Sequence, residues 1–128
     1  MATKTIAFDG SAGNGAIGTI NLFTITGDVA ISIFGLCSED LVGATATIEV
    51  GVSGLTTACI AQTTATNLDN NLAWIDASPT HFETLPVTKI GRGKIVIATI
   101  ATAAITDGTL NMYALWRPLS PGASVVAA

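Results

Sequence analysis

Short runs of Thr, Val and Ile with alternating apolar and polar positions recur along the chain, separated by clusters of Gly, Asn and Asp. Such β-branched side chains are stiff at χ1 and suit a pleated surface. The spacing of apolar residues that marks an amphipathic helix is nearly absent. Turn clusters at intervals of about 8–12 residues are typical of an all-β sandwich or barrel. A chain of 128 residues has room for one such domain.

The alternation assigns faces to several strands. Val29, Ile31 and Ile33 share one face of their strand, and Asp107-Gly108 is the strongest hairpin signal in the chain. We expect connections at residues 38–43 and 91–93. The expected strands are Thr3–Phe8, Ala16–Thr26, Val29–Cys37, Ala44–Val52, Leu55–Gln62, Leu72–Asp76, His81–Leu85, Lys94–Ile105 and Thr109–Trp116.

This pattern predicts a single-domain antiparallel β-sandwich, jelly-roll-like, with extended terminal arms. The sandwich spans residues 1–116 and includes the N-terminal strand and a glycine-rich turn. Residues 117–128 form an extended C-terminal arm, because Pro118, Pro121 and Gly122 are incompatible with a helix there.

Charged residues are scarce. They make up 11% of the chain, with a net charge of −4, whereas the surface of a soluble monomer usually carries about 25–35%. We therefore expect part of the surface to be buried between subunits of a homo-oligomer. The acidic balance argues against direct nucleic-acid contact. The apolar run Ile95–Ile105 is too short to span a membrane, and the few apolar residues between Lys4 and Asp9 predict no export signal.

Motifs that would carry chemistry are weak. Gly13–Gly18 fits G-x-G-x-x-G, but a strand rather than a helix follows, which argues against a dinucleotide site. His81 is the only histidine, and we interpret it as a surface or interface residue. Asp69 and Asp76 could form a glycosidase-type carboxylate pair or a calcium site, but their spacing matches no EF-hand loop, and we interpret them as solvated loop carboxylates.

The two cysteines, Cys37 and Cys59, match no zinc or redox spacing. They are interpreted as small buried side chains, with a mutual disulfide or a catalytic thiol as alternatives. We predict no catalytic residues, no cofactor and no metal, and hence no enzymatic activity.

The tryptophans and the C-terminal arm are the candidate contact residues. Trp116 lies on a regular strand and is expected in the core, whereas Trp74 lies in an irregular stretch and is assigned an interface role. The candidate interface residues are Trp74, Arg117, Pro118, Leu119, Val125 and Val126.

Three stretches carry a family resemblance: Thr26–Val29, Leu41–Gly51 and Tyr113–Ser120. With these the chain resembles the small, Thr-, Ala- and Gly-rich β proteins of tailed-bacteriophage virions, some of which are capsid decoration (cement) proteins. The resemblance implies assembly in the host bacterial cytoplasm and a place on the capsid exterior. It also implies a trimer that stabilises the shell by bridging subunits of the major capsid protein.

Two other functions fit the same sequence. One is a minor virion component at a head fibre, the head–tail junction or the tail. The other is a carbohydrate- or receptor-binding β module that uses Trp74 with Asp69, Asn70 and Asn71.

Overall fold

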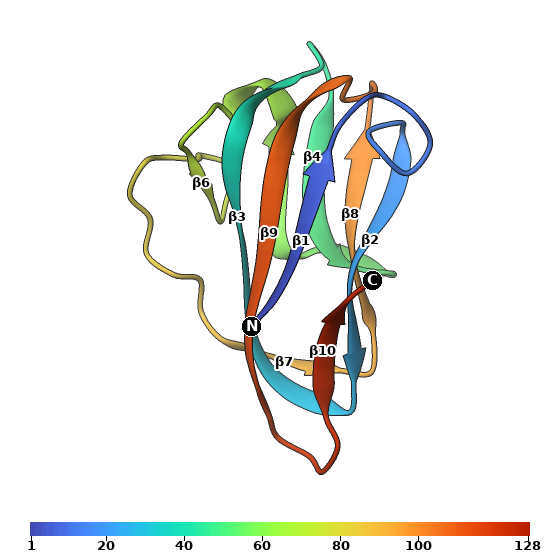
Figure 1. The fold of residues 1–128 in the computed structure, drawn as a ribbon, viewed down its shortest axis with the longest axis vertical. Coiled ribbons are helices and arrows are strands. Elements are labelled where there is room, and N and C mark those ends of the chain that lie inside the picture. Colours follow the sequence, from blue (N-terminus) through green and yellow to red (C-terminus); the bar gives the residue numbers. More distant parts are fainter.

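The computed structural model describes residues 1–128 and is a sandwich of two antiparallel sheets (Figure 1). The first sheet has the order β1-β9-β3-β6, with β7 also paired to β3, and the second has the order β10-β2-β8-β4-β5. The strands are β1 (Ala2–Ala7), β2 (Gly18–Thr26), β3 (Asp28–Val42), β4 (Thr47–Val52), β5 (Leu55–Thr64), β6 (Ala73–Trp74), β7 (Lys89–Arg92), β8 (Ile95–Ala101), β9 (Asp107–Pro118) and β10 (Ser124–Ala127), with a 3-10 turn, η1 (Ala65–Asn67).

The strand pairs are nested along the chain. β4 pairs with β5, β3 with β7, β2 with β8 and β1 with β9, so the chain forms one long double ribbon closed at the β4–β5 turn. Neighbouring pairs of this ribbon lie in opposite sheets, which is the topology of a jelly roll. The predicted all-β, jelly-roll-like sandwich is confirmed.

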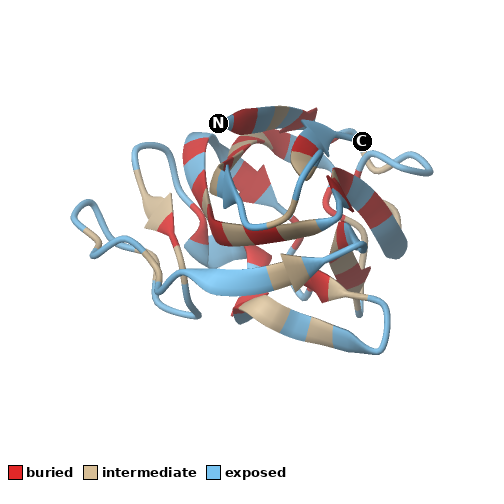
Figure 2. Ribbon diagram, turned by 90° about the horizontal axis from the view of Figure 1, so that it is seen from below, coloured by how far each residue is buried: buried red, intermediate tan, exposed pale blue.

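The core lies between the sheets and follows the predicted alternation (Figure 2). Val29, Ile31 and Ile33 of β3 are at most 4% exposed. Gly35 continues this inward row. A Cβ at Gly35 would lie 2.9 Å from the Met112 sulfur and 3.2 Å from the Trp74 ring, so the absent side chain makes room for the indole.

Two turn predictions are wrong. Asp107-Gly108 opens β9 instead of closing a hairpin, because β8 and β9 lie in different sheets. Gly108 has φ +105°, and a Cβ there would lie 2.5 Å from the carbonyl oxygen of Asp40, so close packing against β3 requires glycine. Residues 38–43 are not a connection, because β3 continues to Val42 through register shifts opposite β9.

The stretch between β5 and β8 also differs from the prediction. No strand forms at His81–Leu85, and only Ala73–Trp74 of the expected Leu72–Asp76 strand is extended. Residues 91–93, expected as a loop, overlap β7, which pairs with the first residues of β3. Residues 75–88 form a long irregular segment that runs from β6 to β7 down one side of the molecule (Figure 1).

The end of the C-terminal arm returns to its own domain. Residues 124–127 form β10, which pairs with β2 at the edge of the second sheet. The arm is held further by Ala128, whose amide donates to Leu22 O and whose carbonyl accepts a hydrogen bond from Lys4.

Candidate functional site

The outer face of the first sheet is apolar at its centre. Because Val29, Ile31 and Ile33 point inward, the alternate residues of β3 point outward, as do their partners on β9. Phe34 and Tyr113 are such partners, and their rings stack with centroids 5.3 Å apart. We define the outer face as its central part, Ala30, Ser32, Phe34, Leu36, Tyr113 and Leu115, and none of these side chains is charged. The β9 partners of the two end residues, Arg117 and Asn111, are polar and lie at its margins. Ser32 is only 8% exposed.

The outer face of the second sheet has a different character. The residues of β2 that alternate with the buried Ile20, Leu22 and Ile25 are Thr19, Asn21 and Thr24. Hydroxyl and amide groups at these positions hydrate the β2 part of this face, although β8 adds Ile95 and Ile97 beside them.

The irregular segment adds further apolar side chains beside the first sheet. We call Phe82, Leu85, Val87 and Ile90 the apolar strip. They are exposed by 96%, 60%, 80% and 72%. Leu85 lines a hollow with Ala30 and Leu115, and also a second hollow with Phe34 and Leu36, so the strip and the outer face are continuous. Large contiguous apolar patches of this kind mark interaction sites.

Hydrogen bonds hold the irregular segment at both ends. Near its start, the amide of Ala73 donates to Thr80 O at 2.7 Å. Near its end, the Ser32 hydroxyl lies 3.3 Å from Pro86 O and 3.2 Å from Thr88 Oγ1. These contacts place the apolar strip on the molecule although the segment has almost no regular structure.

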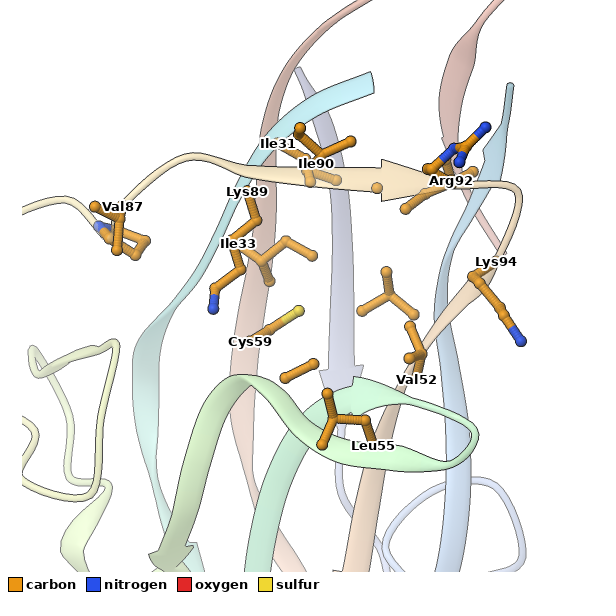
Figure 3. Close-up of a pocket in the computed structure, with 15 residues that line it drawn as sticks. Ile31, Ile33, Val52, Leu55, Cys59, Val87, Lys89, Ile90, Arg92 and Lys94 are labelled. Carbon is orange, nitrogen blue, oxygen red and sulfur yellow. The ribbon is translucent and has the colours of Figure 1, made fainter. Parts of the chain in front are cut away.

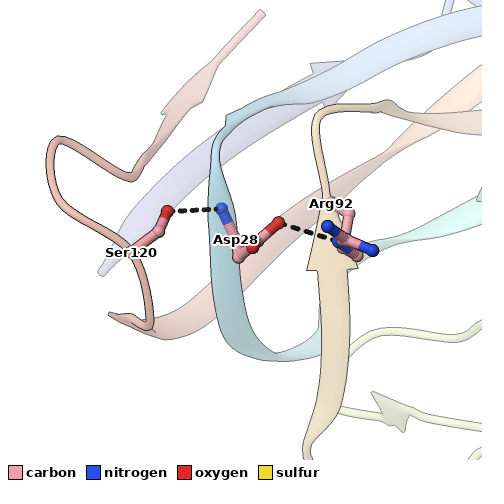
Figure 4. A network of polar contacts seen from close by, with 3 residues as sticks. All are labelled: Asp28, Arg92 and Ser120. Carbon is pink, nitrogen blue, oxygen red and sulfur yellow. Dashed lines mark hydrogen bonds and ion pairs between the residues drawn. The ribbon is translucent and has the colours of Figure 1, made fainter.

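An ion pair fixes β7 to the adjacent strand (Figure 4). Arg92 Nε donates to Asp28 Oδ1 at 2.9 Å, and the Asp28 amide donates to Ser120 Oγ at 3.0 Å. The hydrogen bond to Asp28, and then its charge, raise the pKa of Arg92 above its usual value. The three residues join β3, β7 and the loop that precedes β10.

Four of the six candidate interface residues are exposed: Arg117, Pro118, Leu119 and Val126. Ala30 pairs with Arg117 on one side and with Ile90 on the other, so the structure brings Arg117 into one row with the apolar strip. Pro118 and Leu119 follow at the end of β9, whereas Val126 lies on β10 at the edge of the other sheet.

The structure places the other two candidate interface residues in the core. Trp74 is fully buried, and its indole Nε1 donates to Thr63 Oγ1 at 2.8 Å. Its ring is inaccessible to a partner or a sugar, because β6 packs it against Gly35. Val125 is 3% exposed, because the pairing of β10 with β2 turns it inward.

The groups considered for chemistry are dispersed. No cluster of three or more His, Cys, Asp or Glu residues could hold a metal ion. The Asp76 carboxylate accepts the Ser78 amide at 2.8 Å in a local turn, and His81 is exposed beside the apolar strip. The strand β2 follows the glycine-rich turn at Gly18, as expected.

Both cysteines are free thiols, so the disulfide alternative is not found. Cys37 is buried in the core, and burial raises its pKa. Cys59 is half-buried at the margin of the core, and burial raises its pKa as well, while the charge of Lys89 acts in the opposite direction. A raised pKa disfavours the nucleophilic thiolate at both positions.

None of the four residues of the apolar strip was among the predicted interface residues. A signal was present: Phe82, Leu85 and Val87 are large apolar residues, and the last two flank Pro86. The grouping of Lys89, Arg92 and Lys94 was also missed, although it holds three of the five Lys and Arg residues of the chain.

No protein-family model, curated protein or solved structure matches the chain in the three comparisons. The structure contains no helix of the length and apolar character needed to cross a membrane.

Proposed function

We propose that the protein is a non-enzymatic structural component of a tailed-bacteriophage virion that decorates the capsid exterior. In this role it assembles in the host cytoplasm and binds the major capsid protein as an oligomer, a trimer by the family resemblance. The observation that supports the proposal best is the apolar strip and the outer face continuous with it. Together they form a largely apolar docking surface, with Arg117 and Glu83 at its margin, on a chain that has few charges elsewhere.

The fold supports the proposal by analogy. Jelly rolls are frequent in viral capsid proteins, but they also occur in lectins and other binding proteins. A carbohydrate site built on Trp74 loses its main support, because the indole is buried. A decoration role needs no reactive group, only a rigid domain whose docking surface is repeated in several copies.

The first test is the molar mass of the purified chain, measured by light scattering across a dilution series. We expect a stable trimer. The second test is co-sedimentation with capsid shells that lack the protein, where we expect a fixed stoichiometry and a higher melting temperature of the shell.

Two matched variants show whether the docking surface is responsible. Phe82→Asp puts a charge on the apolar strip, and Ile17→Asp puts one on the loop before β2, where Ile17 is 63% exposed. We expect both variants to fold, because both side chains are exposed, and only Phe82→Asp to abolish co-sedimentation. A wild-type chain that is monomeric and never binds shells would refute the proposal.

A further inference from the structure

An apolar pocket opens between the two sheets at the edge formed by β7 and β5 (Figure 3). Its volume is about 320 Å³, within the range of about 300–1,000 Å³ that is usual for small-molecule sites. The inner wall is formed by core side chains of both sheets: Ile25, Ile31, Ile33 and Val96, each at most 5% exposed. The pocket therefore reaches from the surface into the core.

The opening of the pocket carries positive charge. Lys89, Arg92 and Lys94 are among its lining residues, and no Asp or Glu is. These are three of the five cationic side chains of a protein whose net charge is −4. Arg92 is paired with Asp28, whereas Lys89 and Lys94 have no carboxylate within ion-pair distance. Two uncompensated ammonium groups thus flank an apolar cavity.

The register of β7 directs one of these groups inward. Lys89 pairs with the inward-facing Ile31, so its side chain leaves β7 toward the space between the sheets (Figure 3). Inward-pointing lysines also occur on edge strands as a protection against edge-to-edge pairing. That role would explain Lys89 alone, but not the open apolar pocket beside it or the lack of carboxylates around it.

We propose that this pocket binds a single-chain amphiphile with an anionic head group, such as a medium-chain fatty carboxylate. The acyl chain lies against Ile31, Ile33 and Val96, where apolar burial stabilises it. The carboxylate stays at the opening, within reach of Lys89 or Lys94 in a charge-assisted contact. This inference does not depend on the proposed capsid role. Val87 and Ile90 of the apolar strip also line the pocket, but the dodecanoate site is tested on the isolated chain, without capsid shells.

Cys59 provides a direct reporter of occupancy because its thiol lines the pocket, whereas Cys37 does not. Sodium dodecanoate is titrated below its micelle concentration, and alkylation of the two thiols by iodoacetamide is followed by mass spectrometry at pH 8.5. We expect saturable protection of Cys59 at one dodecanoate per chain. Calorimetry under the same conditions should give the same dissociation constant.

Matched variants test separately how the lysine charges and the cavity contribute to dodecanoate binding. Lys89→Gln and Lys94→Gln together should weaken dodecanoate binding by about tenfold or more, whereas Arg117→Gln, which removes a cation away from the pocket, should not. Ala58→Phe should fill the pocket and abolish binding. Dodecyltrimethylammonium, which has the same chain and the opposite charge, should bind at least about tenfold more weakly than dodecanoate.

Three results would overturn the proposal: no saturable dodecanoate binding by a chain that circular dichroism shows to be folded, equal affinity for the cationic amphiphile, or unchanged dodecanoate binding in Ala58→Phe. Binding only to phosphatidylglycerol vesicles would contradict it as well. Binding of an acetylated Asp-Glu-Leu-Glu peptide in place of dodecanoate would also overturn it and would indicate a protein partner.

Discussion

Asp28 and Arg92 form the only ion pair between two side chains, with 2.9 Å between Oδ1 and Nε. The ion pair joins the first residue of β3 to the last residue of β7, and these two residues are also partners in the antiparallel register. β7 is a short edge strand, and the irregular segment that carries most of the apolar strip leads directly into it. The ion pair therefore helps to set the position of both candidate sites.

Removing this ion pair should loosen β7 without unfolding the sandwich. The Arg92 side chain is 76% exposed, so we expect Arg92→Gln to lower the melting temperature by no more than roughly 4 °C. Amide hydrogen exchange in residues 89–93 should nevertheless become at least about threefold faster, because this edge opens independently of the core. Arg117→Gln removes the same charge without breaking an ion pair and serves as the control. Equal exchange rates in the two variants would contradict the prediction.

The buried contact between Trp74 and Thr63 should contribute measurably to stability. Thr63→Val leaves the indole N–H without an acceptor and should cost about 1–3 kcal/mol in the free energy of unfolding. Trp74→Phe should cost a similar amount, through the lost donor and a small void. Urea denaturation of the double variant should show a loss about 1 kcal/mol smaller than the sum.

The control substitution lies on β5, the strand that carries Thr63. Thr57 is exposed on β5, and Thr57→Val should change the free energy of unfolding by less than about 0.5 kcal/mol. If the losses in the free energy of unfolding caused by the Trp74 and Thr63 substitutions were strictly additive, the hydrogen bond would contribute no coupling energy.

The regular strands could be predicted from the sequence because their faces follow a local rule. Val29, Ile31 and Ile33 alternate with small or polar residues, and any sandwich would bury them. Trp74 could not be placed in this way, because β6 has two residues and no period. Gly108 was wrongly predicted to lie in a hairpin turn for a related reason. A glycine is required there because the β3 backbone leaves no room for a Cβ, and no residue near Gly108 in the sequence indicates this contact.

The candidate sites were harder to predict than the fold. The apolar strip becomes a surface only because Ser32 and Thr80 hold an irregular segment beside the first sheet. The pocket depends on β5 and β7, which are far apart in sequence and meet only in the rolled ribbon. Local pattern carries no information about either juxtaposition.

Adjacent valines on β10 should respond differently to the same change. Val125 is 3% exposed and Val126 is 54% exposed. We expect Val125→Ala to cost about 1–3 kcal/mol in the free energy of unfolding and Val126→Ala less than about 0.5 kcal/mol, as measured by urea denaturation. If the two variants were equally stable, the C-terminal arm would not be packed on its own domain in solution.

The two thiols should make stability fall at high pH. Burial raises the pKa of Cys37 and Cys59 above the ordinary value of 9.0, so the folded chain keeps protons that the unfolded chain has lost. Their contribution is therefore fully present below pH 9 and is lost as the pH rises through the folded values. Each thiol can contribute a slope of at most about 1.4 kcal/mol per pH unit. Urea denaturation between pH 7 and 10.5 should show a steeper decline for the wild type than for the Cys37→Ala, Cys59→Ala double variant, which lacks both thiols. Parallel declines would mean that the thiols ionise equally easily in the folded and unfolded chains.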